Sequence, residues 1–248
     1  MSSTADSPSP IATEEDRIRA AYARRPRSDV RYHPFNASHV FQAQDRERHV
    51  LRLLRRQGLT DLGATTILDV GCGSGSWLRQ FIKWGAAPEN VCGLDLRREA
   101  IATARRLCPA AVCLECGSAM TLPFGDESFD LVLQSTVLTS VLEAAAKQKI
   151  ASELLRVLKR DGLILWYDFL FDNPRNPDVR GVGKREIHEL FRGCRIDLRR
   201  VTLAPPLARW LAPRAWLVTY LLGRIPLLCA HYLGAIRKPT PPRAGPRD

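Results

Sequence analysis

The types and spacing of four residues near position 70 are suited to binding a small ligand. The pattern is D-x-G-x-G-x-G, formed by Asp69, Gly71, Gly73 and Gly75. It follows an apolar run, 65–70, that predicts a buried strand, and it precedes a run with helical periodicity, 76–85. Glycines in such a turn let the backbone approach a ligand where a Cβ would collide with it. We therefore predict a ligand cradle at the carboxyl end of this strand.

The acid at position 69 indicates which kind of ligand this is. Dinucleotide-binding turns read G-x-G-x-x-G and hold a pyrophosphate at the N-terminus of a helix. A carboxylate two residues before Gly71 would repel a pyrophosphate, whereas it suits a ligand with positive charge near the turn. S-adenosylmethionine has an ammonium group, a sulfonium group and no phosphate. We therefore expect it as the ligand.

Three further motifs extend this pattern along the chain. Asp95 ends the next predicted strand, 90–96, where its carboxylate can accept from both hydroxyls of a ribose. The segment 117–124, which reads GSAMTLPF, follows the third predicted strand and is placed to line an adenine slot. The sequence SFDLV at 128–132 opens a fourth strand, and 154–163 joins a helix, expected over 144–162, to a fifth strand.

With these motifs in this order, residues 38–170 resemble a class I S-adenosylmethionine-dependent methyltransferase of the type 11, ubiquinone/menaquinone group. The resemblance implies an α/β, Rossmann-like three-layer sandwich. Its seven-stranded, mostly parallel sheet would have the order 3-2-1-4-5-7-6, with strand 7 alone antiparallel. The cofactor would lie across the carboxyl ends of strands 1 to 4, where open α/β sheets bind ligands.

The resemblance also assigns cofactor contacts by position. The glycine turn would hold the methionine part, Asp95 and Leu96 the ribose side, and the third-strand loop the adenine. Ser118 stands where family members often carry Asp, so it would hold the adenine amino group more weakly. The full set of expected cofactor residues is Asp69, Gly71, Cys72, Gly73, Gly75, Asp95, Leu96, Ser118, Ala119, Met120, Gln134, Tyr32 and Arg46, with Gln42 as a further candidate.

Candidates for a general base are few. Methyl transfer is an in-line displacement, so a hydroxyl acceptor needs alignment and removal of its proton. Asp168 ends the fifth predicted strand, His231 opens the last one, and His33 lies in a loop that we expect to fold over the cofactor. These three residues are the catalytic candidates. We see no metal-ligand spacing, and we expect no metal.

The C-terminal third is expected to select the acceptor. Residues 173–238 resemble methyltransferases found among genes for bacterial surface-polysaccharide and secondary-metabolite assembly, which suggests O-methylation of a sugar or another hydroxylated metabolite. The insertion 204–228 before the last strand is apolar and carries arginines. This segment predicts a helical hairpin that closes the active site. The hairpin could also grip a lipid-linked acceptor or touch a membrane, and the two roles are compatible.

Composition leaves other functions open. The net charge of +11 is compatible with an RNA methyltransferase, although no (D/N)PPY motif, no suitably placed cysteine and no RNA-binding module is present. Transfer to nitrogen or carbon of a small molecule, and a non-catalytic partner role, also stay open. We expect a cytoplasmic protein with reduced thiols, whose inner-membrane contact is at most peripheral. The oligomeric state is open. The expected organisation is a disordered start at 1–12, a helical lid at 13–60, the methyltransferase domain at 61–237 and a disordered tail at 238–248.

Overall fold

The computed structural model describes residues 10–25, 30 and 33–239. Its strands are β1 (Ile67–Val70), β2 (Val91–Asp95), β3 (Cys113–Cys116), β4 (Phe129–Ser135), β5 (Leu158–Phe169), β6 (Arg195–Leu203) and β7 (Cys229–Arg237). Its α-helices are α1 (Pro10–Ala23), α2 (Ala37–Arg56), α3 (Ser76–Lys83), α4 (Arg98–Leu107), α5 (Ala144–Val157), α6 (Lys184–Leu190), α7 (Pro205–Leu211) and α8 (Trp216–Leu222). Within this described part of the chain, no helix has the length and apolar character needed to cross a membrane.

The seven strands form one sheet in the order β3-β2-β1-β4-β5-β7-β6. The pairs from β3 to β5 are parallel, and β7 runs antiparallel to both β5 and β6. This confirms the predicted strand order and the single antiparallel strand. The antiparallel direction of β7 places the connection from β6 at the same edge as the carboxyl ends of β1 to β5, so the insertion 204–228 lies on the cofactor side of the sheet.

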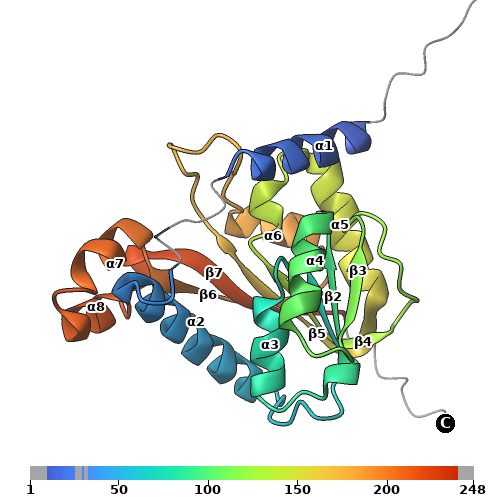
Figure 1. The fold of residues 1–248 in the computed structure, drawn as a ribbon, viewed down its shortest axis with the longest axis horizontal. Helices are drawn as coiled ribbons and strands as arrows, with labels where there is room; N and C mark the ends of the chain where they lie inside the picture. Colours follow the sequence, from blue (N-terminus) through green and yellow to red (C-terminus); the bar gives the residue numbers. More distant parts are fainter. Residues whose placement is uncertain (1–9, 26–29, 31–32, 240–248) are drawn as a thin grey trace, which may run out of the picture.

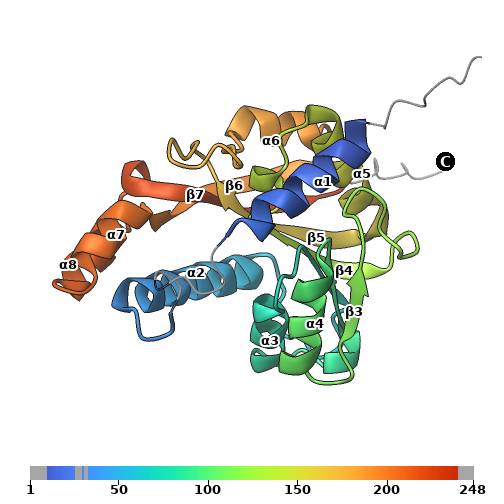
Figure 2. The same cartoon turned by 45° about the horizontal axis from the view of Figure 1, so that its top comes forward.

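Helices cover both faces of the sheet (Figures 1 and 2). One hydrophobic core joins side chains of α2, α3 and α4 to the sheet, and a second joins those of α5 and α6 to its other face. Strands covered on both faces are apolar throughout, which explains why all four residues of β1 are buried. The helix α1 lies beside α5, whereas α7 and α8 form a hairpin that extends from one end of the molecule (Figure 2).

The ends and faces of two helices depend on tertiary contacts. Asn36 caps α2, because its side-chain oxygen accepts from the backbone N–H groups of Ser38 and His39. On this helix Leu53 is buried, whereas Leu51 is 43% exposed. The helix expected over 144–162 ends at Val157, because Leu158 already pairs with Phe129 as part of β5.

Candidate active site

The glycine turn after β1 is held by backbone hydrogen bonds to β2. The N–H groups of Gly71 and Cys72 both donate to the carbonyl of Leu94, at 2.7 and 2.9 Å. Gly71, Gly73 and Gly75 all have positive φ, at 75°, 56° and 76°, which a side chain would strain.

The space around the three glycines differs, so a side chain would be excluded from them for different reasons. A Cβ on Gly71 would lie 2.4 Å from Val137, and one on Gly75 would lie 2.6 Å from the Cys108 sulfur. Only Gly73 faces open space. The expectation that all three make room for a ligand was therefore too simple, since Gly71 and Gly75 also make room for neighbouring side chains.

Asp69 is a buried carboxylate with an unpartnered oxygen. Its side chain is 1% exposed, and its Oδ2 atom has no hydrogen-bond partner among the described residues. Burial raises the pKa of Asp69 well above the ordinary carboxyl value, and the nearby charge of Asp95 raises it further. A cationic group beside Asp69 would remove both penalties. The site therefore fits the ammonium group of S-adenosylmethionine.

Asp95 connects β2 to the glycine turn. One carboxylate oxygen accepts from the Gly73 N–H at 2.9 Å, and the other accepts from the Arg97 N–H at 2.9 Å. The Arg97 guanidinium lies 3.3 Å from the same carboxylate. Each carboxylate oxygen can accept more than one hydrogen bond, so acceptor capacity remains for a ribose diol.

A cavity of about 200 Å³ lies beside these residues. Of the predicted cofactor residues, seven line it: Gly71, Gly73, Asp95, Leu96, Ser118, Ala119 and Met120. Ser135, the last residue of β4, lines it together with Thr136 and Ser140 of the loop that follows, and all three carry hydroxyl groups. This arrangement brings the glycine turn, Asp95 and residues 118–120 together around one cavity.

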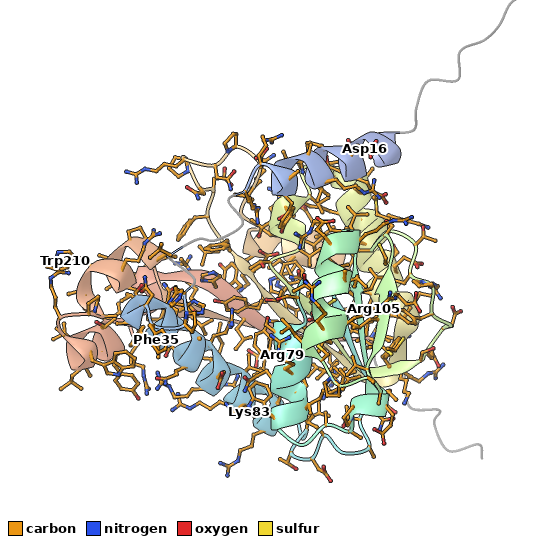
Figure 3. The ribbon with its side chains drawn as sticks, in the orientation of Figure 1. Asp16, Phe35, Arg79, Lys83, Arg105 and Trp210 are labelled. Atoms are coloured by element: carbon orange, nitrogen blue, oxygen red, sulfur yellow. The ribbon has the colours of Figure 1, made fainter. Side chains whose placement is uncertain are left out.

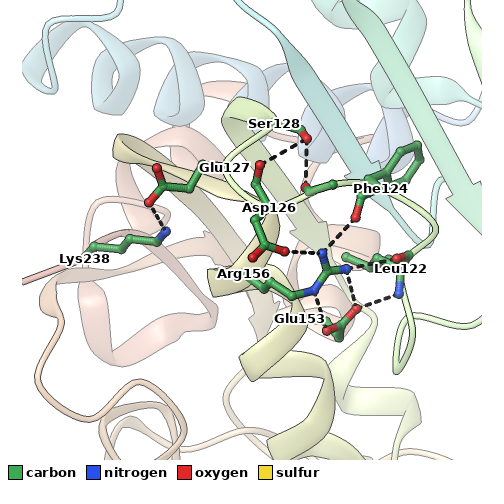
Figure 4. A network of polar contacts seen from close by, with 9 residues as sticks. Leu122, Phe124, Asp126, Glu127, Ser128, Glu153, Arg156 and Lys238 are labelled. Carbon is green, nitrogen blue, oxygen red and sulfur yellow. Dashed lines mark hydrogen bonds and ion pairs between the residues drawn. The ribbon is translucent and has the colours of Figure 1, made fainter.

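The adenine segment is braced from α5 (Figure 4). Glu153 accepts from the Leu122 N–H at 2.7 Å, and Arg156 donates to the carbonyls of Leu122 and Phe124 at 2.9 and 2.8 Å. Arg156 also pairs with Glu153 and Asp126, each at 2.8 Å. This network fixes the backbone that follows Met120, and it was not predicted because its partners are about 30 residues apart in sequence.

The helix α1 closes the other side of the cavity, where it contributes Glu15, Ile18 and Tyr22. Glu14 accepts from the Leu142 N–H at 2.5 Å, and Arg17 donates to the Ser140 carbonyl at 2.6 Å. These two bonds attach α1 to the loop after β4. We predicted a helix here but not these contacts. The i, i+4 spacing of Ile18 and Tyr22 was the available signal.

The three catalytic candidates do not line this cavity. Asp168 is fully buried and accepts from the N–H groups of Thr139 and Phe169 at 3.1 and 2.9 Å. Burial raises the pKa of Asp168 to about 7. His33 is exposed, and its Nδ1 accepts from the Phe35 N–H at 3.3 Å.

His231 is 4% exposed and stacks on the Tyr167 ring with centroids 4.6 Å apart. Its Nδ1 has no hydrogen-bond partner among the described residues. Burial, followed by the charge of Arg46, lowers the pKa of His231 to about 3, so the ring is neutral at physiological pH.

The remaining cofactor candidates occupy the edges of the site. Arg46 lies over the rings of Trp77 and Tyr167, at 4.8 and 5.7 Å, and so beside the first turn of α3. Gln134 is buried on the opposite face of the sheet and accepts from the Val137 N–H at 3.3 Å. Cys72 and Gly75 belong to the turn without lining the cavity. Gln42, like Arg46, is partly buried on α2, and Tyr32 lies outside the described residues.

No group of three or more His, Cys, Asp or Glu in the described part of the chain is placed to hold a metal ion.

Comparison with known proteins agrees with this geometry. Residues 67–162 match the family model described as a methyltransferase domain. An O-methyltransferase of Penicillium expansum is 31% identical over 130 residues, which are 50% of this chain and 45% of that protein. A demethylmenaquinone methyltransferase of Shouchella clausii is 32% identical over 105 residues, covering 41% of this chain and 43% of that protein. The chain thus spans less than half the length of these curated relatives.

Solved structures show the same fold. A S-adenosylmethionine-dependent methyltransferase from Methanosarcina mazei aligns with 76% of this chain and 98% of its own, with a TM-score of 0.55 and 20% identity. The [4+2]-cyclase SpnF aligns with 79% of this chain and 82% of its own, at a TM-score of 0.56 and 20% identity. Residues 67–162 therefore match a methyltransferase domain, and the chain shares its fold with S-adenosylmethionine-dependent methyltransferases.

Proposed function

We propose that this protein transfers a methyl group from S-adenosylmethionine to a hydroxyl of a small acceptor, with a sugar or another secondary metabolite as the expected class. The observation that carries the proposal is the cavity that Asp95, the glycine turn and residues 118–120 line together. Asp69 does not line this cavity, but it lies two residues before Gly71, is buried, and has one carboxylate oxygen without a hydrogen-bond partner among the described residues. A buried carboxylate without a partner is costly, and an ammonium group would compensate it.

Different residues would hold different parts of the cofactor. Asp69 would hold the ammonium group, Asp95 the ribose hydroxyls, and residues 118–120 the adenine. Arg46, beside the first turn of α3, would hold the carboxylate of the methionine part. Bound S-adenosylmethionine supplies an electrophilic methyl group on a sulfonium, which leaves as a neutral thioether.

The acceptor's hydroxyl would be oriented by the last residue of β4 and the loop after it. Ser135, Thr136 and Ser140 offer side-chain hydroxyls to the cavity, and Tyr22 of α1 faces them. The Tyr22 hydroxyl lies 3.3 Å from that of Ser140. Because α1 covers this space, it would exclude water from the reacting groups once the acceptor is bound.

Two of the base candidates fit different tasks. His231 is neutral, its Nδ1 has no partner within the described part of the chain, and its ring stacks on Tyr167, which pairs in register with the cavity residue Ser135. We propose that it takes the acceptor proton. Asp168 holds the Thr139 N–H and so positions the loop that carries Ser140. His33, exposed beside Phe35, is the weakest of the three candidates.

Calorimetric titration with S-adenosylmethionine and S-adenosylhomocysteine tests the proposal. Wild type should bind both, and Asp95→Ala should lose binding, since it removes the ribose acceptor and the anchor of Gly73. Glu189→Gln is a matched control, because it changes an exposed carboxylate that pairs with Arg185 on the same helix and does not line the cavity. Unchanged affinity in Asp95→Ala would refute the assignment. An acceptor screen with hydroxylated sugars and metabolites would follow.

Other acceptors are distinguished by simple measurements. The relatives named demethylmenaquinone methyltransferase and sterol 24-C-methyltransferase keep transfer to another atom open, and mass spectrometry of the product would identify the methylated atom. The +11 charge keeps RNA open, and RNA binding would fall steeply with salt. The cyclase neighbour shows that the fold alone does not determine the reaction. If this protein binds no S-adenosylmethionine, the hypothesis of a non-catalytic partner role would be favoured instead.

A further inference from the structure

The α7–α8 hairpin, residues 204–228, has the reverse of the usual helical pattern. Its buried side is made of small residues: Ala208, Ala212, Thr219 and Gly223. Its large apolar side chains point outward: Trp210 is 63% exposed, Leu217 68%, Leu221 56% and Leu227 79%. A helix of a water-soluble domain normally buries its large apolar residues, so this exposed surface is suited to contact with an apolar partner outside the protein.

The hairpin is also purely basic. Residues 204–228 contain Arg209, Arg214 and Arg224 and no Asp or Glu. All three arginines are exposed. Arg214 donates to the carbonyl of Trp210, and Arg224 contacts the hydroxyl of Tyr220, so these cations lie beside the apolar residues. Tryptophan and arginine next to exposed leucines match the composition of helices that lie in the interface of an anionic bilayer.

The position of the hairpin determines which way its apolar surface faces relative to the rest of the protein. Trp210 projects away from the body of the protein, and Phe35, which is 91% exposed, lies at the start of α2 near α7 (Figure 3). The hairpin is fixed to α2 by an edge contact between Phe41 and Trp216, with centroids 5.0 Å apart. It leaves β6 at the sheet edge that also carries the glycine turn and the cofactor cavity.

We propose that the α7–α8 hairpin docks this protein on an anionic lipid surface and thereby turns the cofactor edge toward the bilayer. The outward leucines and Trp210 enter the boundary between headgroups and acyl chains, and the three arginines contact the lipid phosphates. Docking itself is independent of the proposed methyl transfer. If both hold, the acceptor is a hydroxylated molecule with a lipid anchor.

Vesicle co-sedimentation tests the docking. The full-length protein is mixed with vesicles of phosphatidylcholine alone or with phosphatidylglycerol added, at low and high salt. We expect binding to the mixed vesicles that weakens with salt and falls strongly without the anionic lipid. The Leu217→Ser/Leu221→Ser variant should bind at least about tenfold more weakly, since two exposed leucines lose their transfer to the lipid phase.

Two controls separate docking from general effects. Leu107→Ser removes a leucine that is 52% exposed on α4, a helix that lies apart from the hairpin (Figure 1), and should bind like wild type. The Arg209→Gln/Arg214→Gln variant should lose the preference for phosphatidylglycerol, whereas Arg185→Gln on α6 should keep it. Circular dichroism confirms that each variant is folded. Since every substituted side chain is exposed, we expect no loss of fold.

Light scattering on the same samples distinguishes another use of the surface. If wild type dimerises, binds no vesicle of either composition, and becomes monomeric in Leu217→Ser/Leu221→Ser, the hairpin is an interface between two copies and the proposal is overturned. Equal vesicle binding by wild type and both hairpin variants would overturn it as well. Calorimetry with S-adenosylmethionine reports the proposed function separately, because none of these substitutions touches the cofactor cavity.

Discussion

The Asp69→Asn substitution tests the charge of the cofactor site with almost no change of shape. In the ligand-free protein burial raises the pKa of this carboxyl group, and the nearby charge of Asp95 raises it further. One of its oxygens has no hydrogen-bond partner among the described residues. Replacing the carboxylate with a neutral amide removes the cost of a buried charge. We therefore expect the ligand-free variant to be at least as stable as wild type, which is unusual for a substitution at a buried polar residue.

Affinity should change in the opposite direction. A hydrogen bond to a charged partner contributes about 1.5–3 kcal/mol, and a factor of ten in affinity corresponds to about 1.4 kcal/mol. The dissociation constant for S-adenosylmethionine should therefore rise about 10- to 100-fold in Asp69→Asn. Calorimetry measures this value, and thermal unfolding without ligand measures the stability.

The pH dependence gives a second signature. Because the folded-state pKa of Asp69 is raised, its protonated form stabilises the fold at low pH, and this contribution is lost as pH rises through the raised pKa. The stability advantage of Asp69→Asn should therefore grow with pH and then level off. Cofactor binding favours the ionised carboxylate, so wild type should release a proton on binding within that pH range, and the variant should not.

Two results would refute this reasoning. If Asp69→Asn destabilises the ligand-free protein by more than about 1 kcal/mol and leaves the affinity intact, the carboxylate serves the fold rather than the cofactor. If proton release in buffers of different ionisation enthalpy is the same for wild type and variant, another group accounts for it.

The remaining predictions concern the turn, the brace and the loop after β4. Gly75→Ala should lower the free energy of unfolding by about 2–4 kcal/mol, because its Cβ would meet the Cys108 sulfur and the positive φ would be strained. Gly73→Ala faces open space and should lower it by only about 1–2 kcal/mol. Urea unfolding measures both values. Arg156→Met should cost about 1–3 kcal/mol and weaken cofactor binding, because the loop after Met120 loses its brace; a variant with wild-type affinity would contradict the second part. The pKa of Asp168 is raised to about 7, so the stability that its protonated form provides is lost as pH rises toward neutrality, and Asp168→Asn should show a flatter stability profile over that range. An identical profile would show that Asp168 does not titrate there.

Much of the fold followed from local patterns. Near-continuous apolar strands between helical segments indicate a parallel sheet covered on both faces, whereas the strand order was expected only from the family resemblance. The glycine turn and Asp95 were recognisable because short-range chemistry defines them: positive φ at closely spaced positions, and a carboxylate at the end of a strand. Seven of the predicted residues do meet around one cavity.

The rest depends on contacts between segments distant in the chain. Glu14 and Arg17 join the loop after β4 across more than 120 positions, and no periodicity reports such a pairing. Likewise, Asp168 and His231 lie at the expected edge of the sheet, yet alternation along the strands turns their side chains to opposite faces and neither lines the cavity. The sequence by itself determined the strands, the turn and the positions of Asp69 and Asp95 in β1 and β2, because each depends on backbone geometry over a few residues. Only the tertiary structure decided which helix covers the cavity and which side chains face it, because side-chain direction depends on how whole elements pack.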